Sequence, residues 1–206
     1  MILRTNFKGC SALGLLVVCV SVACGDSGTG GAGGAGGAGG TGGAGGSTGT
    51  GTSGPALAVN EIQPHDFEWV ELANTTDEDV DLEGYGLCDE DASGDCDTDK
   101  MIRFPAGTTL TAGGFLLILT DQDPLEGVGP HATCLGGVSE CFYAPWKVSA
   151  VDGETVRLLD TMDEEVNGLT YPPNSTVDST ASYARLPDGT GDPGVATPTP
   201  GAANAE

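Results

Sequence analysis

The sequence predicts an all-β domain built as a two-sheet sandwich, and three observations support this prediction. A run of five apolar residues, Phe115–Leu119, lies between Gly113-Gly114 and Thr120-Asp121 and is too short for a typical helix. Roughly eight short strand-like segments, separated by turn signals about every ten residues, follow residue 55. No stretch combines a helical apolar period with capping residues.

Residues 1–23 have the pattern of an export signal. A basic start, with Arg4 and Lys8, precedes an apolar centre, Ala12–Val20, and a small-residue end. The apolar centre is too short to cross a bilayer as a helix. We therefore expect this segment to be removed on export.

The last residues of the signal, Ser21–Ala23, and the Cys24 that follows them resemble a bacterial lipobox. The resemblance implies cleavage before Cys24 and acylation of its thiol, and several acyl chains hold a protein on a membrane more firmly than one. Ser21 departs from the pattern, in which Leu is usual three residues before the cysteine. The expected location is the cell envelope, as an outer-membrane lipoprotein, and the alternative is cleavage after Ala23 and free secretion.

Residues 24–55 contain Cys24 and a low-complexity segment rich in Gly, Ala, Thr and Ser. The segment has no large apolar side chain, so it cannot offset its own ordering entropy. About thirty such residues have a root-mean-square reach of roughly 30 Å. We therefore expect a flexible Gly-rich tether between the lipid anchor and a folded domain that covers residues 56–206.

The domain is expected to contain a single core, formed by Val70, Leu72, Phe104, Leu116, Ile118, Val156 and Leu158. Ile102–Asp121 is predicted to be a hairpin-like unit at its centre, with the second strand buried on both faces. Val80–Leu87 is expected to bend at Gly84 or Gly86, and Asp123–Cys141 to form a long loop. The predicted strands are Leu57–Ile62, Phe67–Asn74, Val80–Leu87, Met101–Phe104, Phe115–Leu119, Trp146–Val151, Thr155–Asp160, Val166–Tyr171 and Ser182–Leu186.

The charge of the chain excludes one class of partner. Thirty acidic residues stand against seven basic ones, and two of the basic residues lie in the signal. Because no Lys/Arg surface is left to meet phosphate, we expect no nucleic-acid partner, and electrostatic binding to anionic lipid is disfavoured as well. Solubility on a crowded surface explains the acidity, and binding of divalent cations is the alternative.

Seven segments in register resemble the lamin tail domain family. Each segment is short, but their common order over Leu57–Asn204 makes the resemblance specific. The segments are Val59–Ile62 (VNEI), Trp69–Asn74 (WVELAN), Val80–Leu87 (VDLEGYGL) with Asp89, Phe104–Thr108 (FPAGT), Gly153–Asp160 (GETVRLLD), Ser182–Gly189 (SYARLPDG) and Thr199–Asn204 (TPGAAN).

The resemblance implies an immunoglobulin-like β-sandwich. In nuclear lamins this domain binds protein and chromatin, and in bacteria it occurs on exported proteins, often beside hydrolases. The family has no shared catalytic residues to carry over, and the acidity of this chain argues against the chromatin role. We expect a non-catalytic binding or display module that needs no cofactor, is held on the membrane by its lipid, and binds a protein or a polysaccharide. The alternative is a secreted or surface hydrolase that uses the Asp123–Cys141 loop.

The domain has four cysteines, Cys88, Cys96, Cys134 and Cys141, which is an even number in a chain that looks exported. Disulfides are therefore favoured over a zinc site, whose cysteines are usually more closely spaced. Three pairings are possible. The pairing of sequence neighbours, Cys88 with Cys96 and Cys134 with Cys141, is favoured because each pair closes one Gly-containing loop.

The acidic loop after Cys88 is a candidate calcium site. Oxygen-bearing side chains alternate along it around Gly94, as they do in calcium-binding loops. Lys100 occupies the place where an EF-hand has its bidentate Glu, and the alternative is a solvated acidic turn. The candidate ligands are Asp89, Asp91, Ser93 and Asp97.

Catalytic interpretations of the other polar residues are weaker than structural ones. A Ser-His-Asp arrangement can be drawn around His131, but the chain has no nucleophile elbow and a solvated loop histidine is the better interpretation. Glu61 and Glu71 suggest the carboxylate pair of a glycosidase. Because both glutamates are polar residues on strands, we instead expect them on a wet or hydrogen-bonded face.

Overall fold

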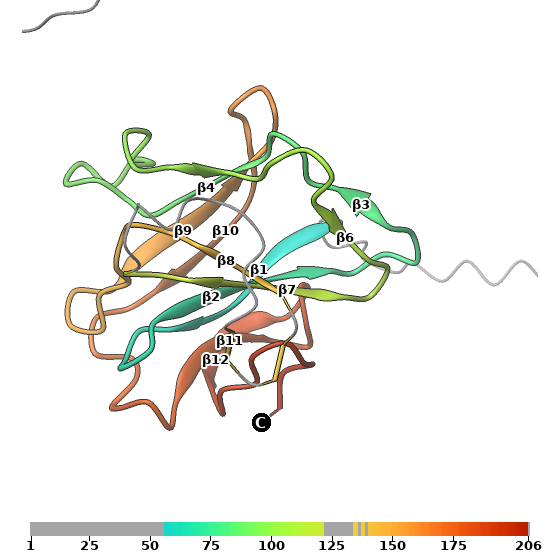
Figure 1. Cartoon of the computed structure of the whole chain (residues 1–206). Helices are drawn as coiled ribbons and strands as arrows, with labels where there is room; N and C mark the ends of the chain where they lie inside the picture. The colour runs from blue at the N-terminus through green and yellow to red at the C-terminus, as the bar shows by residue number, and fades with distance from the viewer. Residues whose placement is uncertain (1–55, 122–133, 136, 139, 206) are drawn as a thin grey trace, which may run out of the picture. The chain divides into compact units, whose positions relative to one another are not determined.

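The structure, a computed structural model, describes residues 56–121, 134–135, 137–138 and 140–205. The signal, the tether with Cys24 and most of the Asp123–Cys141 loop lie outside the described residues. The described residues form a six-stranded sheet, a four-stranded sheet and a two-stranded ribbon (Figure 1). They contain no helix, and hence none that is long and apolar enough to cross a membrane. The predicted all-β sandwich is confirmed.

The six-stranded sheet contains both the first two and the last two strands of the domain. Its first strand, β1, lies between β2 and β11, and its strand pairs are antiparallel except for the parallel β7–β8 pair. The strand order is β12 (Asp192–Ala196), β11 (Ser182–Leu186), β1 (Leu57–Gln63), β2 (Trp69–Asn74), β7 (Phe115–Leu119) and β8 (Cys141–Tyr143).

The second layer is a four-stranded sheet beside a short ribbon. The predicted strand Val80–Leu87 is divided between them, because the backbone turns at Gly84 with a φ of +78°, which confirms the expected bend. The sheet order is β10 (Glu165–Tyr171), β9 (Glu154–Leu159), β4 (Gly86–Cys88) and β5 (Ile102–Arg103), and the ribbon pairs β3 (Val80–Asp81) with β6 (Thr109–Leu110).

The main core lies between the two sheets. All seven side chains that the sequence predicted for it belong to one buried cluster, which confirms these residues as part of the core. Within the cluster the rings of Phe104 and Phe142 meet edge to face, with centroids 5.2 Å apart. Leu87 and Leu158 of the four-stranded sheet belong to the same cluster and are completely buried.

Ile102–Asp121 does not form the predicted hairpin. β5 pairs with β4 in one sheet, whereas β7 pairs with β2 in the other. Ile102 and Ile118 therefore enter the same core cluster from opposite layers, an arrangement that two neighbouring strands of one sheet cannot provide. The prediction failed because apolar periodicity identifies a strand but not its partner.

One predicted strand is wrong, and three strands were missed, namely β8, β12 and the short ribbon strand β6. Trp146–Val151 is irregular, although Trp146 and Val148 are buried in the main core. The strand in this region is β8, which begins at the predicted end of the long loop. The edge strand β12 was missed as well, because its Pro and Gly residues carry no strand signal.

The three central strands β1, β2 and β7 are buried on both faces. On the outer face, Trp69, Leu117, Leu119 and Cys141 form a second apolar cluster, and Leu135 and Val138 pack against it. This arrangement confirms the prediction that Phe115–Leu119 is buried on both faces, because the side chains of β7 alternate between the two clusters.

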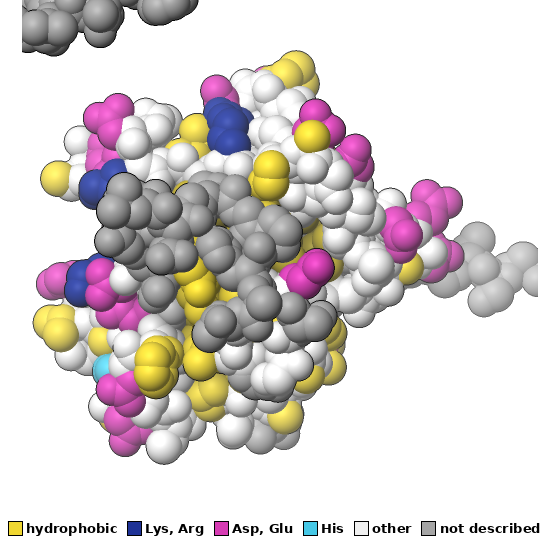
Figure 2. All heavy atoms as spheres, viewed as in Figure 1, with side chains coloured by type: hydrophobic (Ala, Val, Ile, Leu, Met, Phe, Trp, Pro, Cys, Tyr) yellow, Lys and Arg dark blue, Asp and Glu magenta, His cyan; other side chains and the backbone are white. Residues whose placement is uncertain are grey.

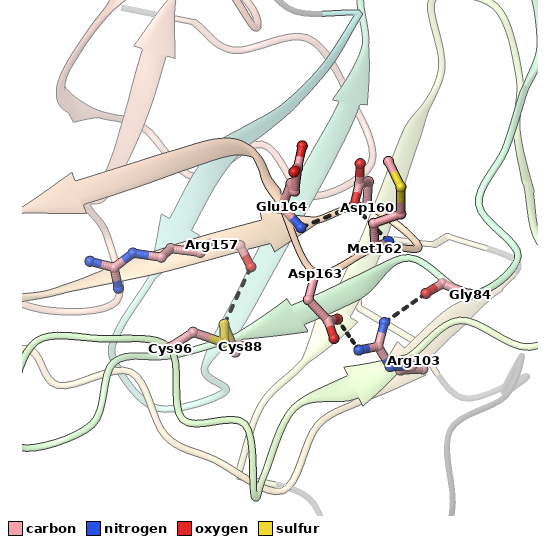
Figure 3. Close-up of polar contacts among 9 residues, drawn as sticks. All are labelled: Gly84, Cys88, Cys96, Arg103, Arg157, Asp160, Met162, Asp163 and Glu164. Atoms are coloured by element: carbon pink, nitrogen blue, oxygen red, sulfur yellow. Dashed lines mark hydrogen bonds and ion pairs between the residues drawn. A yellow bond between two sulfur atoms is a disulfide. The ribbon is translucent and has the colours of Figure 1, made fainter.

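Both predicted disulfides are present. Cys88 is bonded to Cys96 and Cys134 to Cys141, with Cα–Cα distances of 5.7 and 5.8 Å. The first bridge closes the acidic loop onto the end of β4, where the Cys88 sulfur lies 3.8 Å from the carbonyl oxygen of Arg157 (Figure 3). The pairing of sequence neighbours is thus confirmed.

We predict that Leu117→Ala lowers the free energy of unfolding by about 2–5 kcal/mol, because it leaves a cavity on a covered face. Val195→Ala is the control, since Val195 is 58% exposed on β12, and its effect should stay within about 0.5 kcal/mol. Urea denaturation of both variants measures the difference. An equally small effect of Leu117→Ala would contradict burial of the outer face.

Candidate functional site

A pocket of about 550 Å³ opens beside the connection from β1 to β2. Its walls come from this connection, from the segments before and after the β11–β12 pair, and from the loop that precedes β8. Most of its lining side chains are aromatic or apolar. They are Gln63, His65, Asp66, Phe67, Trp69, Leu135, Ser179, Pro198 and Pro200.

Phe67 is the exposed aromatic side chain of this pocket, which we call the Phe67 pocket. Its side chain is 72% exposed, whereas Trp69 in the same lining is 2% exposed and belongs to the outer-face cluster. Asp66, with a φ of 57°, turns the chain immediately before the ring. The pocket therefore combines a buried indole with a phenyl ring that is open to solvent.

Hydrogen bonds brace the frame of the Phe67 pocket. The Gln63 side-chain amide donates to the carbonyl oxygens of Ser179, at 3.2 Å, and Ala181, at 2.9 Å. The imidazole Nε2 of His65 lies 3.0 Å from the hydroxyl oxygen of Thr176. These contacts tie the β1–β2 connection to the segment before β11, so the pocket is preformed.

Two glutamates lie buried on the same outer face. Glu61 of β1 and Glu71 of β2 are register partners, and both side chains are 0% exposed. A β-bulge at Asn60 turns its amide to this face, where it donates to Glu71 at 3.2 Å and to Asp188 at 2.9 Å. The hydroxyl of Ser182 donates to Glu61. These glutamates are hydrogen-bonded as predicted, but the alternative of a wet face is wrong because the chain folds over them.

The cover over the glutamates is the segment after β12, Thr197–Ala205, which we call the C-terminal strap. An isolated bridge between Thr197 and Ala205 closes it into a loop. Three of its backbone N–H groups donate to three different carboxylates. The pairs are Thr199 with Glu61 at 3.2 Å, Gly201 with Glu71 at 2.6 Å, and Asn204 with Asp188 at 3.0 Å.

Gly201 is a position of the strap that has no room for a larger residue. Its φ of +78° belongs to the left-handed region, and an added Cβ would clash with the side chain of Val138. The strap and the Cys134–Cys141 loop therefore meet over β2, and together they cover the outer face.

The buried glutamates have no neighbouring cation among the described residues. Burial raises the pKa of Glu71 from its usual 4.5 to about 8, although the hydrogen bond from Gly201 opposes the shift. Burial also raises the pKa of Glu61. All five basic residues after the signal have other partners: Lys100 with Asp97, Arg103 with Asp163, Lys147 with Asp121, Arg157 with Glu165, and Arg185 with backbone carbonyls.

The candidate calcium residues are engaged in separate local contacts. Asp91 accepts the backbone N–H of Ser93 at 2.7 Å, and Asp97 forms an ion pair with Lys100 at 2.6 Å. Asp89 is buried, which raises its pKa to about 6, and its Oδ1 has no hydrogen-bond partner in the described part of the chain. No group of three or more potential metal-binding side chains occurs among the described residues. Calcium binding stays a prediction.

The other predicted site residues fall outside the structure's description. Cys24, the proposed lipidation site, and His131, the centre of the hydrolase alternative, both belong to the undescribed residues. Sequence reasoning missed Phe67 and the strap. Phe67 was assigned to a strand by its neighbours, and Thr199–Asn204 was noticed only as a family segment, because backbone N–H donors leave no trace in a sequence.

Comparison with known families agrees with this architecture. The family described as Lamin Tail Domain matches residues 50–173, which is more than half of the 206-residue chain. The match runs from before β1 to the end of β10 and stops before β11 and the strap. No curated protein matches the chain. The immunoglobulin-like fold of this family is not a known catalytic fold. This chain belongs to the lamin tail domain family.

Proposed function

We propose that this protein is an exported, lipid-anchored binding module that contacts its ligand through the Phe67 pocket and performs no catalysis. The ligand is a protein or polysaccharide chain at the cell envelope. The observation that carries the proposal is the pocket itself, in which an exposed phenyl ring stands beside apolar walls on a braced frame.

The surroundings of the pocket support binding rather than simple solubility. Acidic side chains are spread around the face shown in Figure 2, and Lys and Arg side chains occupy fewer places. A preformed pocket with mostly apolar walls and a few polar groups is the usual form of a ligand site, and Phe67 adds an exposed aromatic ring to it. The leader and tether support display: an acylated Cys24 and the Gly-rich segment would hold the domain off a membrane.

We predict that Phe67→Ser weakens ligand capture at least tenfold, because burying a phenyl ring contributes about 1.5–3 kcal/mol. The full chain would be immobilised and incubated with an envelope extract of the producing cells. Met162→Ser is the matched control, since Met162 is also 72% exposed but does not line the pocket. Equal capture by wild type and Phe67→Ser would refute the pocket as the contact site.

We predict that Cys24→Ala releases the protein from membranes without unfolding the domain, because the tether separates the anchor from the core. Detergent partitioning and intact mass measure the release and the acylation. A mature protein that carries an unmodified Cys24 and stays in the aqueous phase would contradict the lipid anchor and favour free secretion.

We also propose calcium binding at the acidic loop, supported by the buried Oδ1 of Asp89, which has no hydrogen-bond partner among the described residues, and by the close spacing of the aspartates. The melting temperature should then rise with free calcium, and Asp89→Asn with Asp91→Asn should remove the gain. Asp77→Asn with Asp79→Asn, in the β2–β3 connection, is the control pair. Coincident melting curves in millimolar calcium and in chelator would support the solvated-turn alternative.

A further inference from the structure

We propose that the C-terminal strap is a pH-dependent cover, which stays closed while Glu61 and Glu71 share a proton and is released when both are ionised. The strap supplies Pro198 and Pro200 to the wall of the Phe67 pocket. Its release therefore opens that wall, and this part of the inference rests on the proposed function and adds a regulation to it.

The geometry makes closure depend on the carboxylates. The strap, TPTPGAANA, has no charged side chain and no large aliphatic or aromatic one, so apolar burial contributes little to its attachment. Its backbone N–H groups instead bond to Glu61, Glu71 and Asp188, and the Thr199 hydroxyl adds a bond to Glu61 at 2.9 Å. The strap's other bonds to the sheets come from the side-chain amide of Asn204, which donates to the carbonyl oxygens of Arg185 at 2.9 Å and Asn60 at 3.4 Å. Most of the bonds that hold the strap among the described residues therefore end on carboxylates.

The same carboxylates oppose closure when they are ionised. Glu61 and Glu71 face each other across the β1–β2 pair and lie out of water, where like charges repel strongly. Asp188, in the turn between β11 and β12, adds a third negative charge nearby. A proton on either glutamate removes one buried charge and leaves carboxyl oxygens to accept the N–H bonds.

The elements packed around the pair supply no opposite charge. From β7, Leu117 is the register partner of Glu71, and from β11, Ser182 bonds to Glu61. Arg185 of β11 donates to the backbone carbonyls of Val59, Gly191 and Gly168 instead. His65 lines the Phe67 pocket, and its imidazole Nε2 lies 3.0 Å from the Thr176 hydroxyl. Among the described residues the charge of the pair is therefore balanced only by protons.

The direction of the pH effect follows from proton binding. In the closed state the pKa of Glu71 is raised to about 8, and release returns the side chain to water, where its usual value is 4.5. The closed state thus binds the proton more tightly than the released state. The stabilisation that this proton gives to the closed state is fully present below pH 4.5. As pH rises from there toward 8, the opening equilibrium shifts roughly tenfold per pH unit toward release, and it levels off above pH 8.

Hydrogen–deuterium exchange of the full chain at pH 6 and pH 9 tests the proposal, with rates corrected for intrinsic exchange at each pH. Protection of the strap, Thr197–Ala205, should fall at least tenfold between the two pH values, whereas β9 should change less than about twofold. Unchanged protection of the strap overturns the proposal. Equal loss in β9 also overturns it, since the domain would then be unfolding as a whole.

Two variants link the effect to the carboxylates. Glu71→Gln keeps an acceptor for Gly201 but removes the ionisation, so strap protection should become the same at both pH values. If the first variant does not fold, Glu61→Gln removes the neighbouring charge that helps to raise the pKa of Glu71, so the fall in strap protection between pH 6 and pH 9 should be smaller than in the wild type. Glu83→Gln, an exposed glutamate outside the strap, is the control and should retain the wild-type pH dependence. A Gln variant that folds and still loses protection as the wild type does overturns the proposal.

The readouts separate this inference from the proposed function. Exchange is measured without any ligand, so strap release can be confirmed even if capture does not depend on Phe67. Conversely, capture that depends on Phe67 but is equal at pH 6 and pH 9, with a strap that stays protected, would leave the binding site standing and refute the cover.

Discussion

The double burial of β1, β2 and β7 is the constraint on which the rest of this domain depends. Two-sheet sandwiches require only one covered face per sheet, but here the outer face of the central strands also carries apolar and carboxylate side chains that are shielded from water. Two segments without regular structure provide that shield. The disulfide-closed loop at Cys134–Cys141 covers the apolar half, and the C-terminal strap covers the carboxylate half.

The two covering segments are held in place by different kinds of interaction, and the candidate site lies between them. The loop side is held by apolar contacts and a covalent bond, both insensitive to protonation. The strap side is held by N–H donors on carboxylates that have no cation beside them among the described residues, which makes its attachment conditional on charge. The Phe67 pocket lies where the two covers meet, with Leu135 from one and Pro198 and Pro200 from the other. A displacement of either covering segment would therefore change the walls of this pocket.

Membership of the lamin tail domain family explains the frame but not this arrangement of covers. The matched range ends at residue 173, whereas β11, β12 and the strap follow it. The terminal segment is nevertheless the part that seals Glu61 and Glu71, which belong to the first two strands. The earliest and latest parts of the domain are thus interdependent, and folding must close a long chain segment before the glutamates gain their hydrogen bonds from the strap.

Much of the candidate site was beyond prediction from the sequence. The glutamates were recognised as hydrogen-bonded strand residues, but their backbone donors belong to a segment more than a hundred residues away. Such donors are present at every residue, so no pattern marks the ones that are used. Phe67 was hidden for a related reason, because an aromatic residue beside a strand predicts burial and only the fold leaves this ring in solvent.

From the sequence alone, the all-β class, the core residues and the disulfide pairing were predicted and then confirmed. The division into signal, tether and domain was also predicted from the sequence, and it stays a prediction. Those properties depend on local composition, period-two alternation and short loop closures, which are all written along the chain. Only the tertiary structure decided that Ile102 and Ile118 belong to opposite sheets and that the TPGAAN segment covers a carboxylate pair. The physical reason is that strand partners and buried charges are selected by contacts between distant segments, and local sequence does not encode which segments will meet.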